Sequence, residues 1–374
     1  MRIGKIFGID IIVNLSWIFI FAFVAWALID QGPFRLIAIS PLQRITLGII
    51  TALLFFASVL THELAHSLVA RKRGIPIASI TLFIFGGVSS LQGEPNTAPV
   101  EAWIAFVGPL TSLVLGVLFT ALSLLVVGPK TPLGTATQYL GMANLILGVF
   151  NLLPAYPLDG GRVLHALAWR WTKDRFRATQ IASNVGRVMA IAFIGCGAFS
   201  ALYSGAGFGA GLWLIFIGWF LLQAGGAERM QAELMHSLSG LQAKDIAIDP
   251  PPPLPADVTA EVALQTMMKT GARALPVMLG DQLLGILTMA DFAKLGDRGP
   301  AEAYVTSLMT RTEDLKSALP TASAVEVVKN LLQTGVGQIP VMNDSGALLG
   351  FVTRQSVLQR IGLQREYTRV SRAA

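Results

Sequence analysis

The sequence predicts a multipass α-helical membrane domain of about six transmembrane helices, with a short membrane-associated β-hairpin or strand, followed by a cytoplasmic α+β module. Of the 374 residues, 53% are hydrophobic and only 13% are charged. The mean hydropathy of +0.61 lies far above the usual balance of a soluble globular protein. Long apolar runs fill the first part of the chain, and an internal repeat fills the last part.

The apolar runs define the membrane domain, which we assign to residues 1–230. A helix needs about 20 apolar residues to cross the hydrocarbon core of a bilayer. We interpret six apolar stretches as spans, at 11–29, 45–70, 103–127, 135–153, 188–203 and 212–223. The glycine-rich segment 204–211 separates the last two spans, because glycine disfavours a regular helix.

Basic residues set the expected orientation, because cytoplasmic loops retain Lys and Arg. With six spans, one side receives the triplet 71–73 and the basic cluster within 162–187, whereas the other receives only Arg35, Arg44 and Lys130. We therefore expect a protein of the cell membrane, in contact with lipid, with both termini in the cytoplasm. Because the basic residues cluster beside the apolar runs, as membrane topology requires, the net charge of +6 does not indicate nucleic-acid binding, and nucleic acid is not an expected partner.

An H-E-x-x-H motif, His62-Glu63-Leu64-Ala65-His66, follows the charge-free run 45–61. Residues four apart share one helix face, so His62 and His66 can reach one metal ion while Glu63 reaches a metal-bound water. The motif also occurs by chance in solvated helices. Beside a bilayer core, however, such ionisable groups are costly unless they bind something. The pattern predicts a zinc hydrolase with one ion per chain.

A zinc hydrolase needs a third protein ligand and an open position for water. His165 is typical of an interfacial helix side chain, and His236 lies in a polar stretch past the last span. Asp159 follows a segment broken by Pro154 and Pro157, and irregular backbone at membrane depth is tolerated where it lines a wet cavity. Taken alone, Asp-Gly-Gly is typical of a membrane-exit turn. Together with the histidine pair, we favour Asp159 as a ligand.

The second motif runs from Asn151 to Gly160 and has the pattern N-x-x-P-x-x-x-L-D-G. With H-E-x-x-H before it, and both in apolar context, the chain resembles the site-2 protease family of intramembrane zinc metalloproteases over residues 1 to about 230. Both motifs match without departure. The resemblance implies zinc binding by His62, His66 and Asp159, a catalytic base in Glu63, and positioning of the substrate or the oxyanion by Asn151.

Gly86 and Gly87 follow a β-rich stretch between the second and third spans. The stretch is too short to span as a helix, and it fits an amphipathic β-hairpin and a re-entrant segment equally well. By resemblance to the same family it is a membrane-inserted strand, whose edge could receive an unwound substrate by strand addition. The expected function is hydrolysis of a peptide bond in or near a transmembrane segment of a membrane protein, which is regulated intramembrane proteolysis.

The last part of the chain contains two copies of one unit. The recurring pairs are Thr270-Gly271 with Thr334-Gly335, Leu275-Pro276-Val277 with Ile339-Pro340-Val341, and the segment 285–288 with 350–353. The offset is 64 residues for the first two pairs and 65 for the third, after an insertion near Gly346, and such self-similarity indicates a repeated supersecondary unit, here with α+β character. It resembles the cystathionine β-synthase (CBS) domain pair, a regulatory module. We place a linker and lead-in at 231–257, the repeats at 242–300 and 301–363, and a tail at 364–374.

By the same resemblance, the CBS pair could bind an adenine nucleotide such as ATP or AMP. In that family a Thr or Ser followed three residues later by Asp contacts phosphate and ribose. The first copy has Thr288 and Asp291, but the second has Thr353 and Ser356 without a carboxylate. Asp291 is equally typical of a helix N-cap. Nucleotide binding, capping alone, and homodimerisation through the CBS domains all stay open.

Two other functional classes stay open at this point. The first is a CBS-gated transporter or channel, in which intramembrane polar residues would line the path of the ion; Asp159, Asn144 and Asn151 fit that role. Transport has no use for a glutamate between two helically spaced histidines, however, and the spans show no inverted repeat. A catalytically silent scaffold is the second alternative, against which the retained Glu63 argues, because a structural zinc needs no base.

Overall fold

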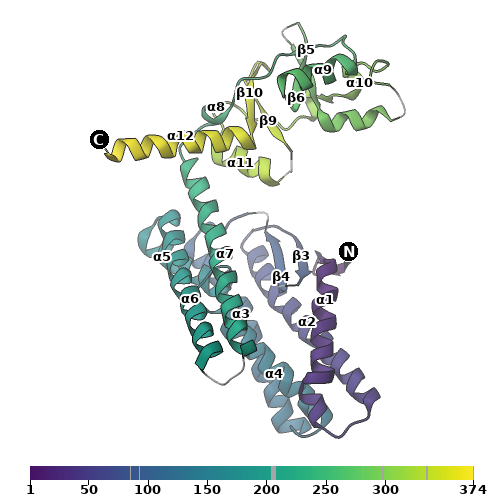
Figure 1. Ribbon diagram of the computed structural model, residues 1–374, viewed down its shortest axis with the longest axis vertical. Helices are drawn as coiled ribbons and strands as arrows, with labels where there is room; N and C mark the ends of the chain where they lie inside the picture. Colours follow the sequence, from purple (N-terminus) through teal and green to yellow (C-terminus); the bar gives the residue numbers. More distant parts are fainter. Residues whose placement is uncertain are drawn as a thin grey trace. The chain divides into compact units, whose positions relative to one another are not determined.

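A computed structural model of the chain divides it into two units, Met1–Ala232 and Glu233–Ala374 (Figure 1). It describes residues 1–84, 86–91, 93–203, 208–280, 282–296, 299–333 and 336–373. The boundary falls where the long apolar runs of the sequence end and the polar lead-in to the repeats begins.

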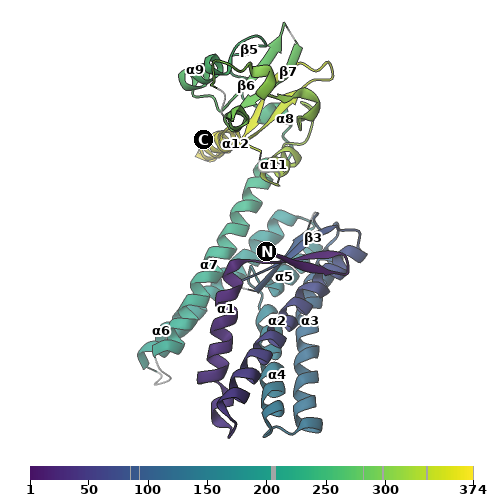
Figure 2. The same cartoon turned by 90° about the vertical axis from the view of Figure 1, so that its right-hand side faces the viewer.

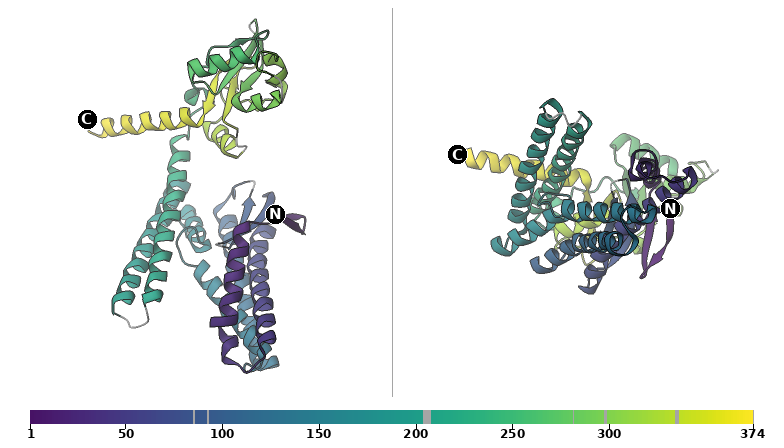
Figure 3. Two further views of the ribbon diagram at one scale, coloured as in Figure 1. Left: turned by 45° about the vertical axis from the view of Figure 1, so that its right-hand side comes forward. Right: turned by 90° about the horizontal axis from the view of Figure 1, so that it is seen from below.

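The first unit is a helical membrane domain. Among the described residues, five helices are long and apolar enough to cross a membrane. They are α1 (Leu15–Trp26, continued by irregular turns to Leu36), α2 (Pro41–Lys72), α3 (Ala98–Leu122, continued to Val127), α6 (Arg175–Tyr203) and α7 (Phe208–Ser237). Helices α1 to α4 lie side by side (Figure 2), and α6 and α7 form an antiparallel pair (Figures 1 and 3). Residues 204–207, within the predicted glycine-rich break, lie outside the described residues.

The predicted fourth span is helix α4 (Pro132–Asn151), which Thr131 caps and which packs against α2 and α3. It is not among the five because its sequence is more polar, with Gln138 and Asn144 in it. Asn144 is fully buried and donates to the Ser58 hydroxyl of α2 at 3.2 Å. The predicted number of six spans therefore stays a prediction.

Three of the helices that contain predicted spans have bounds clearly different from those spans. The first begins at Leu15 rather than at residue 11, because Ile9–Val13 is a strand. Helix α6 begins at Arg175 rather than at residue 188, and α7 continues to Ser237 rather than ending at residue 223. Charged side chains limit the apolar part of a span but do not stop a helix, so both helices continue into polar sequence.

A four-stranded sheet joins the N-terminus to the segment between α2 and α3. Its order is β1 (Arg2–Ile6), β2 (Ile9–Val13), β3 (Ile77–Phe83) and β4 (Gly86–Leu91). Strands β2 and β3 pair in parallel and the other neighbours are antiparallel. The expected hairpin is β3 and β4, and Phe85, which lies between them in the sequence, is outside the described residues. Strands β1 and β2 were not predicted, because the apolar residues of β2 were counted with the first span.

The sheet packs on the part of α2 that carries the H-E-x-x-H motif. Ile9, Ile11 and Ile80 are buried against Leu60 and Leu64 of α2. Among the described strands β1 and β4 are the two edge strands of this sheet, and β4 has β3 on its inner side. The sheet therefore places an edge strand beside the motif.

The second unit contains the two α+β repeats. Its first group of elements is α8 (Ala243–Ile246), β5 (Leu254–Pro255), α9 (Ala260–Thr270), β6 (Ala274–Leu279), β7 (Gln282–Thr288), α10 (Val305–Leu308) and β8 (Thr310–Arg311). Its second group is α11 (Ala324–Gln333), β9 (Gln338–Met342), β10 (Leu348–Thr353) and α12 (Arg354–Ala373). One sheet has the order β5-β6-β7-β8 and the other pairs β10 with β9. Of the recurring pairs, Thr334-Gly335 lies outside the described residues.

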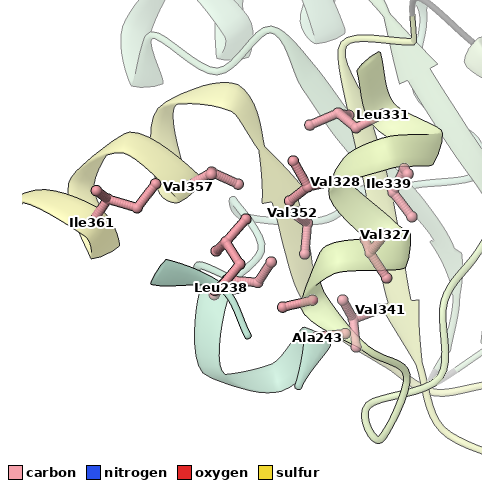
Figure 4. Packing of buried hydrophobic residues seen from close by; sticks show 12 residues of the cluster. Leu238, Ala243, Val327, Val328, Leu331, Ile339, Val341, Val352, Val357 and Ile361 are labelled. Carbon is pink, nitrogen blue, oxygen red and sulfur yellow. The ribbon is translucent and has the colours of Figure 1, made fainter. Parts of the chain in front are cut away.

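The core of the second repeat includes residues from the stretch 231–257, which was predicted as a linker and lead-in. Leu238 and Ala243 pack with Val327, Val341 and Val352 in one buried cluster (Figure 4). The proline-rich segment that follows is also part of the fold, because β5 pairs in parallel with β6. Most of the stretch predicted as a linker is therefore structured.

Candidate active site

Three side chains from two helices converge inside the membrane unit. His62 and His66 lie one turn apart on α2 and are 4% and 7% exposed. Asp159 is the first residue of α5 (Asp159–Thr172). Its Oδ2 atom lies 3.1 Å from Nε2 of His62 and 3.2 Å from Nε2 of His66, and the two Nε2 atoms are 3.1 Å apart. The three residues predicted as ligands are thus grouped closely enough to hold one metal ion.

The other nitrogen of each imidazole is held by helix α3. His66 Nδ1 donates to the carbonyl oxygen of Ile104 at 2.6 Å, and His62 Nδ1 lies 2.9 Å from Ser112 Oγ. A carbonyl oxygen only accepts, so the proton of a neutral His66 lies on Nδ1 and its Nε2 presents a lone pair toward Asp159. Contacts of this kind fix the ring orientation of metal-binding histidines.

The spacing and chemistry of the three atoms fit a zinc ion. Lone pairs and a carboxylate oxygen that face one another at 3.1–3.2 Å repel unless a cation or a proton lies among them. Tetrahedral zinc with bonds of about 2.0–2.1 Å would hold its ligand atoms about 3.3 Å apart. Two imidazoles and one carboxylate also form a known catalytic ligand set that leaves one position open for water.

Gly108 of α3 provides the room for this group. A Cβ atom built on Gly108 would overlap His66 Nε2 and would lie 2.7 Å from His62 Nε2. Both imidazoles are already fixed by the contacts of their Nδ1 atoms with α3, so they cannot easily move away. Any other residue at this position would therefore fill the space between the two imidazoles.

The side chain of Glu63 extends from helix α2 toward strand β4. Ser89 Oγ donates a hydrogen bond to Glu63 Oε2 at 3.1 Å. A Cβ atom built on Gly87 would overlap Glu63 Cγ, so the strand backbone lies directly against this side chain. The predicted base and the predicted substrate strand are thus in contact.

Known proteins with related sequences match both parts of the chain. The profile described as Peptidase family M50 matches residues 50–139 and 130–193, and the CBS domain profile matches 243–297 and 305–363. Protein sll0528 of Synechocystis sp. is 37% identical over 370 residues, which cover 96% of this chain and 94% of the relative. The chain belongs to peptidase family M50. It is a site-2 protease-like zinc metalloprotease that carries a CBS domain pair.

Other relatives are similar over comparable lengths. Rip3 of Mycobacterium tuberculosis is 33% identical over 369 residues, covering 97% of this chain and 93% of its own. MJ0392 of Methanocaldococcus jannaschii is 26% identical over 367 residues, covering 97% and 96%. MJ0392 is named a zinc metalloprotease, and sll0528 and Rip3 are each named a putative zinc metalloprotease. A solved site-2 protease from M. jannaschii is 29% identical and covers 61% of this chain and 94% of its own, with a TM-score of 0.43.

Two further residues predicted to contact substrate lie at the ends of elements. Asn151 is the last residue of α4, and its Nδ2 donates to the carbonyl oxygen of Leu147 at 2.9 Å. Among the described residues, no hydrogen bond joins Asn151 to Asp159 or to the histidine pair. Gly86 opens β4 with a φ of +124°, a backbone conformation that favours glycine. Their roles toward substrate stay predictions.

His165 is not the interfacial side chain that the sequence indicated. It is 7% exposed, and its Nδ1 lies 3.0 Å from both carboxylate oxygens of Glu101 on α3. Its Nε2 lies 3.3 Å from the carbonyl oxygen of Arg175 at the start of α6. Both ring nitrogens therefore face hydrogen-bond acceptors, a carboxylate on one side and a carbonyl oxygen on the other. This buried pair, which sequence reasoning missed, ties α5 and its Asp159 to α3.

A cleft in the second unit is lined by both predicted phosphate-contacting threonines. Its volume is about 1070 Å³, and Thr288 and Thr353 line it from different repeats. Three cationic and two acidic side chains contribute to the lining: Arg273, Lys316, Arg354, Asp249 and Asp314. The cleft has the size and the positive groups that a phosphorylated small molecule needs.

The prediction that Asp291 is a helix N-cap was wrong in position: Thr288 is the N-cap of a short 3-10 helix, Met289–Leu295, and Asp291 is the third residue of that helix and bonds back to Thr288. Its Oδ2 accepts from the backbone N–H of Thr288 at 2.8 Å and from the Thr288 hydroxyl at 2.7 Å, and its Oδ1 pairs with Lys294 Nζ at 2.7 Å. Burial works against ionisation, but the hydrogen bonds from Lys294 and Thr288 outweigh it and hold the pKa of Asp291 below its ordinary value. Asp291 is not among the residues that line the cleft.

Proposed function

We propose that the chain is an intramembrane protease that hydrolyses a peptide bond in or near a transmembrane segment of a membrane-protein substrate. The observation that supports this most directly is the meeting of His62, His66 and Asp159 on helices of a multipass membrane domain. Membership of peptidase family M50 supports the reaction class. Burial of the site within apolar helices supports a membrane-embedded substrate.

In this proposal each site residue has a defined task. A zinc ion held by His62, His66 and Asp159 would lower the pKa of its bound water and polarise the scissile carbonyl. Glu63 accepts a proton from the attacking water and donates it to the leaving amine. Ile104 and Ser112 keep the two imidazoles oriented through their outward nitrogens.

Strand β4 is the proposed docking site for the substrate backbone. A substrate helix has its backbone hydrogen bonds paired internally, so the scissile segment must unwind before attack. The outer position of β4 in the sheet and its contact with Glu63 support strand addition at this edge. Gly86 and Gly87 keep this segment free of side chains, and Asn151 is proposed to position the substrate or the oxyanion.

The decisive experiment measures zinc content and cleavage in detergent-purified protein. We expect one zinc per chain and cleavage of a model transmembrane substrate. Glu63→Gln should keep the zinc and abolish cleavage, whereas His62→Ala should lose both. A protein that moves ions in liposomes without cleaving would favour the transporter alternative. Zinc held without any cleavage would favour a structural scaffold.

A second proposed activity is binding of an adenine nucleotide in the CBS cleft. The lining by Thr288 and Thr353, together with three cationic side chains, supports a phosphate-bearing ligand. Calorimetry of the full chain with ATP and with AMP tests this. The double variant Thr288→Ala, Thr353→Ala should abolish binding, and Thr266→Ala, outside the lining, should not. Heat release unchanged in the double variant would exclude the cleft as the site.

We propose that the CBS pair and both termini lie in the cytoplasm and that the CBS pair regulates the protease. The excess of Lys and Arg on that side of the predicted topology supports the orientation. Cysteine labelling from either side of sealed vesicles tests it. Cleavage rates with and without ATP or AMP, and the oligomeric state in detergent, then test whether the module controls the protease and whether it forms a homodimer.

A further inference from the structure

We propose that Ser89 is a positioning residue that sets the orientation of the Glu63 carboxylate and links it to strand β4. The inference rests on the proposed protease function, because Glu63 is the base of that reaction. It adds a residue outside both sequence motifs, on a strand that lies between them in the chain. Ser89 does not touch the three candidate ligands among the described contacts, so it acts through Glu63.

A chain of hydroxyl groups connects helix α2 to the base through the strand. Ser89 Oγ donates to Glu63 Oε2 at 3.1 Å and lies 3.0 Å from Ser67 Oγ. A serine hydroxyl has one proton, so when Ser89 donates to the carboxylate, Ser67 donates to Ser89. Ser67 is fully buried and lies one helical turn after Glu63 on α2. Ser89 is therefore held from one side while it holds Glu63 on the other.

The contact limits how the carboxylate can turn. With Oε2 held by Ser89 and Cγ against the backbone of Gly87, rotation of the carboxylate would break the hydrogen bond or move the strand. The oxygen Oε1 has no hydrogen-bond partner among the described residues. It is thus the oxygen available for the proton of the attacking water. A base held in one orientation loses less freedom in the transition state.

The alternation of β4 makes this contact specific to one face of the strand. Successive side chains of a strand point to opposite faces, so Gly87 and Ser89 share the face toward α2. Their neighbours Val88 and Ser90 are exposed, which agrees with that pattern. Ser90 is the same residue type, one position away, on the opposite face. It is a matched control for Ser89.

The position of β4 at the sheet edge gives the contact a second consequence. Ser89 is paired with Ile80 on the inner side of β4, and its outer side has no described strand. A substrate strand added to that outer side would order the backbone of β4 and, through Ser89, the carboxylate of Glu63. Substrate docking and orientation of the base would thereby be coupled through one hydrogen bond.

The test compares Ser89→Ala with Ser90→Ala in the full-length, zinc-loaded protein. Loss of one hydrogen bond to a charged group should lower kcat about tenfold or more, with KM changed less than about twofold. Ser90→Ala should leave kcat and KM unchanged. Ser89→Thr, which keeps the hydroxyl, should restore most of kcat. Zinc content and melting temperature should be unchanged in all three variants.

A spectroscopic readout tests the contact without activity. The difference between infrared spectra of the wild type and of Glu63→Gln isolates the carboxylate band of Glu63. That band should shift in Ser89→Ala and stay in place in Ser90→Ala. The measurement needs neither metal nor substrate, so it reports on the hydrogen bond itself.

The possible outcomes separate the inference from the proposed function. A zinc-loaded wild type that cleaves no substrate contradicts the protease proposal, whatever the infrared result. If the wild type cleaves, an unchanged kcat or an unmoved band in Ser89→Ala overturns the positioning role. Loss of zinc or a lower melting temperature in Ser89→Ala also overturns it, because Ser89 would then support the fold of the site rather than the base.

Discussion

Asp159 Oδ2 lies 3.1 Å from Nε2 of His62, although 97 residues separate them in the chain. The first residue of α5 thus reaches the motif on α2. The chain turns back between α4 and α5 within residues 152–158, where the prolines interrupt the helix. The candidate centre therefore depends on packing between helices as much as on the H-E-x-x-H motif.

Removal of the Asp159 carboxylate should empty the centre of zinc. In Asp159→Ala two imidazoles remain, and we expect bound zinc to fall from one per chain to a small fraction, with loss of cleavage. Metal analysis of the purified protein measures this. Asp344→Ala removes an exposed carboxylate from a turn of the second unit and should keep full zinc. Full zinc in Asp159→Ala would exclude Asp159 as a ligand.

A single methyl group at Gly108 should have the same effect as loss of a ligand. In Gly108→Ala the new Cβ would overlap His66 Nε2, and the hydrogen bonds of both imidazoles to α3 prevent an easy shift. We expect loss of zinc and of cleavage while the protein still folds. Gly195→Ala on α6, where a Cβ would meet nothing within 4 Å, is the control and should be neutral. Normal zinc in Gly108→Ala would show that α3 adjusts.

Local patterns were enough to predict where the chemistry lies. Helical spacing placed His62 and His66 on one face, and the proline-broken segment singled out Asp159. The structure brings these residues together, and their zinc-binding role stays a prediction. The CBS repeats were found from sequence because two copies of one unit share their turn and strand residues.

The contacts that orient the site could not be found in this way. Ser112 and Ser89 look like ordinary polar residues in the sequence, and only the packing of α3 and β4 on α2 gives them a role. His165 looked interfacial because arginines flank it, while its partner Glu101 lies 64 residues earlier. Pairings over such distances leave no periodic signal in a single sequence.

Loss of the Glu101 carboxylate should destabilise the membrane unit. In Glu101→Gln the buried imidazole of His165 faces an amide instead of a carboxylate, and a buried polar group left without its hydrogen-bond partner costs about 1–3 kcal/mol. We expect a clearly lower melting temperature and weaker zinc retention, because α5 carries Asp159. Thermal unfolding of the zinc-loaded protein measures both.

The control for this prediction is an exposed ion pair at the start of α6. Glu94 and Arg175 lie 2.7 Å apart with much of each side chain in solvent. Exposed pairs contribute at most about 1 kcal/mol, so Glu94→Gln should change the melting temperature little. Equal effects of the two substitutions would mean that the His165–Glu101 pair is not important for stability.

The Asp291 carboxylate should make the free energy of unfolding of the second unit decrease as the pH falls into the acid range. Its pKa is lower in the folded chain than in the unfolded chain, so the unfolded chain binds the proton more readily. The stabilisation is therefore present above the unfolded pKa, near pH 4, and is lost as pH falls through the folded value. Asp291→Ala should lower the unfolding temperature at pH 7, and the difference from wild type should shrink in acid. Asp257→Ala, at an exposed position, should match wild type at every pH. A difference for Asp291→Ala that is constant with pH would mean that the carboxylate acts only by packing.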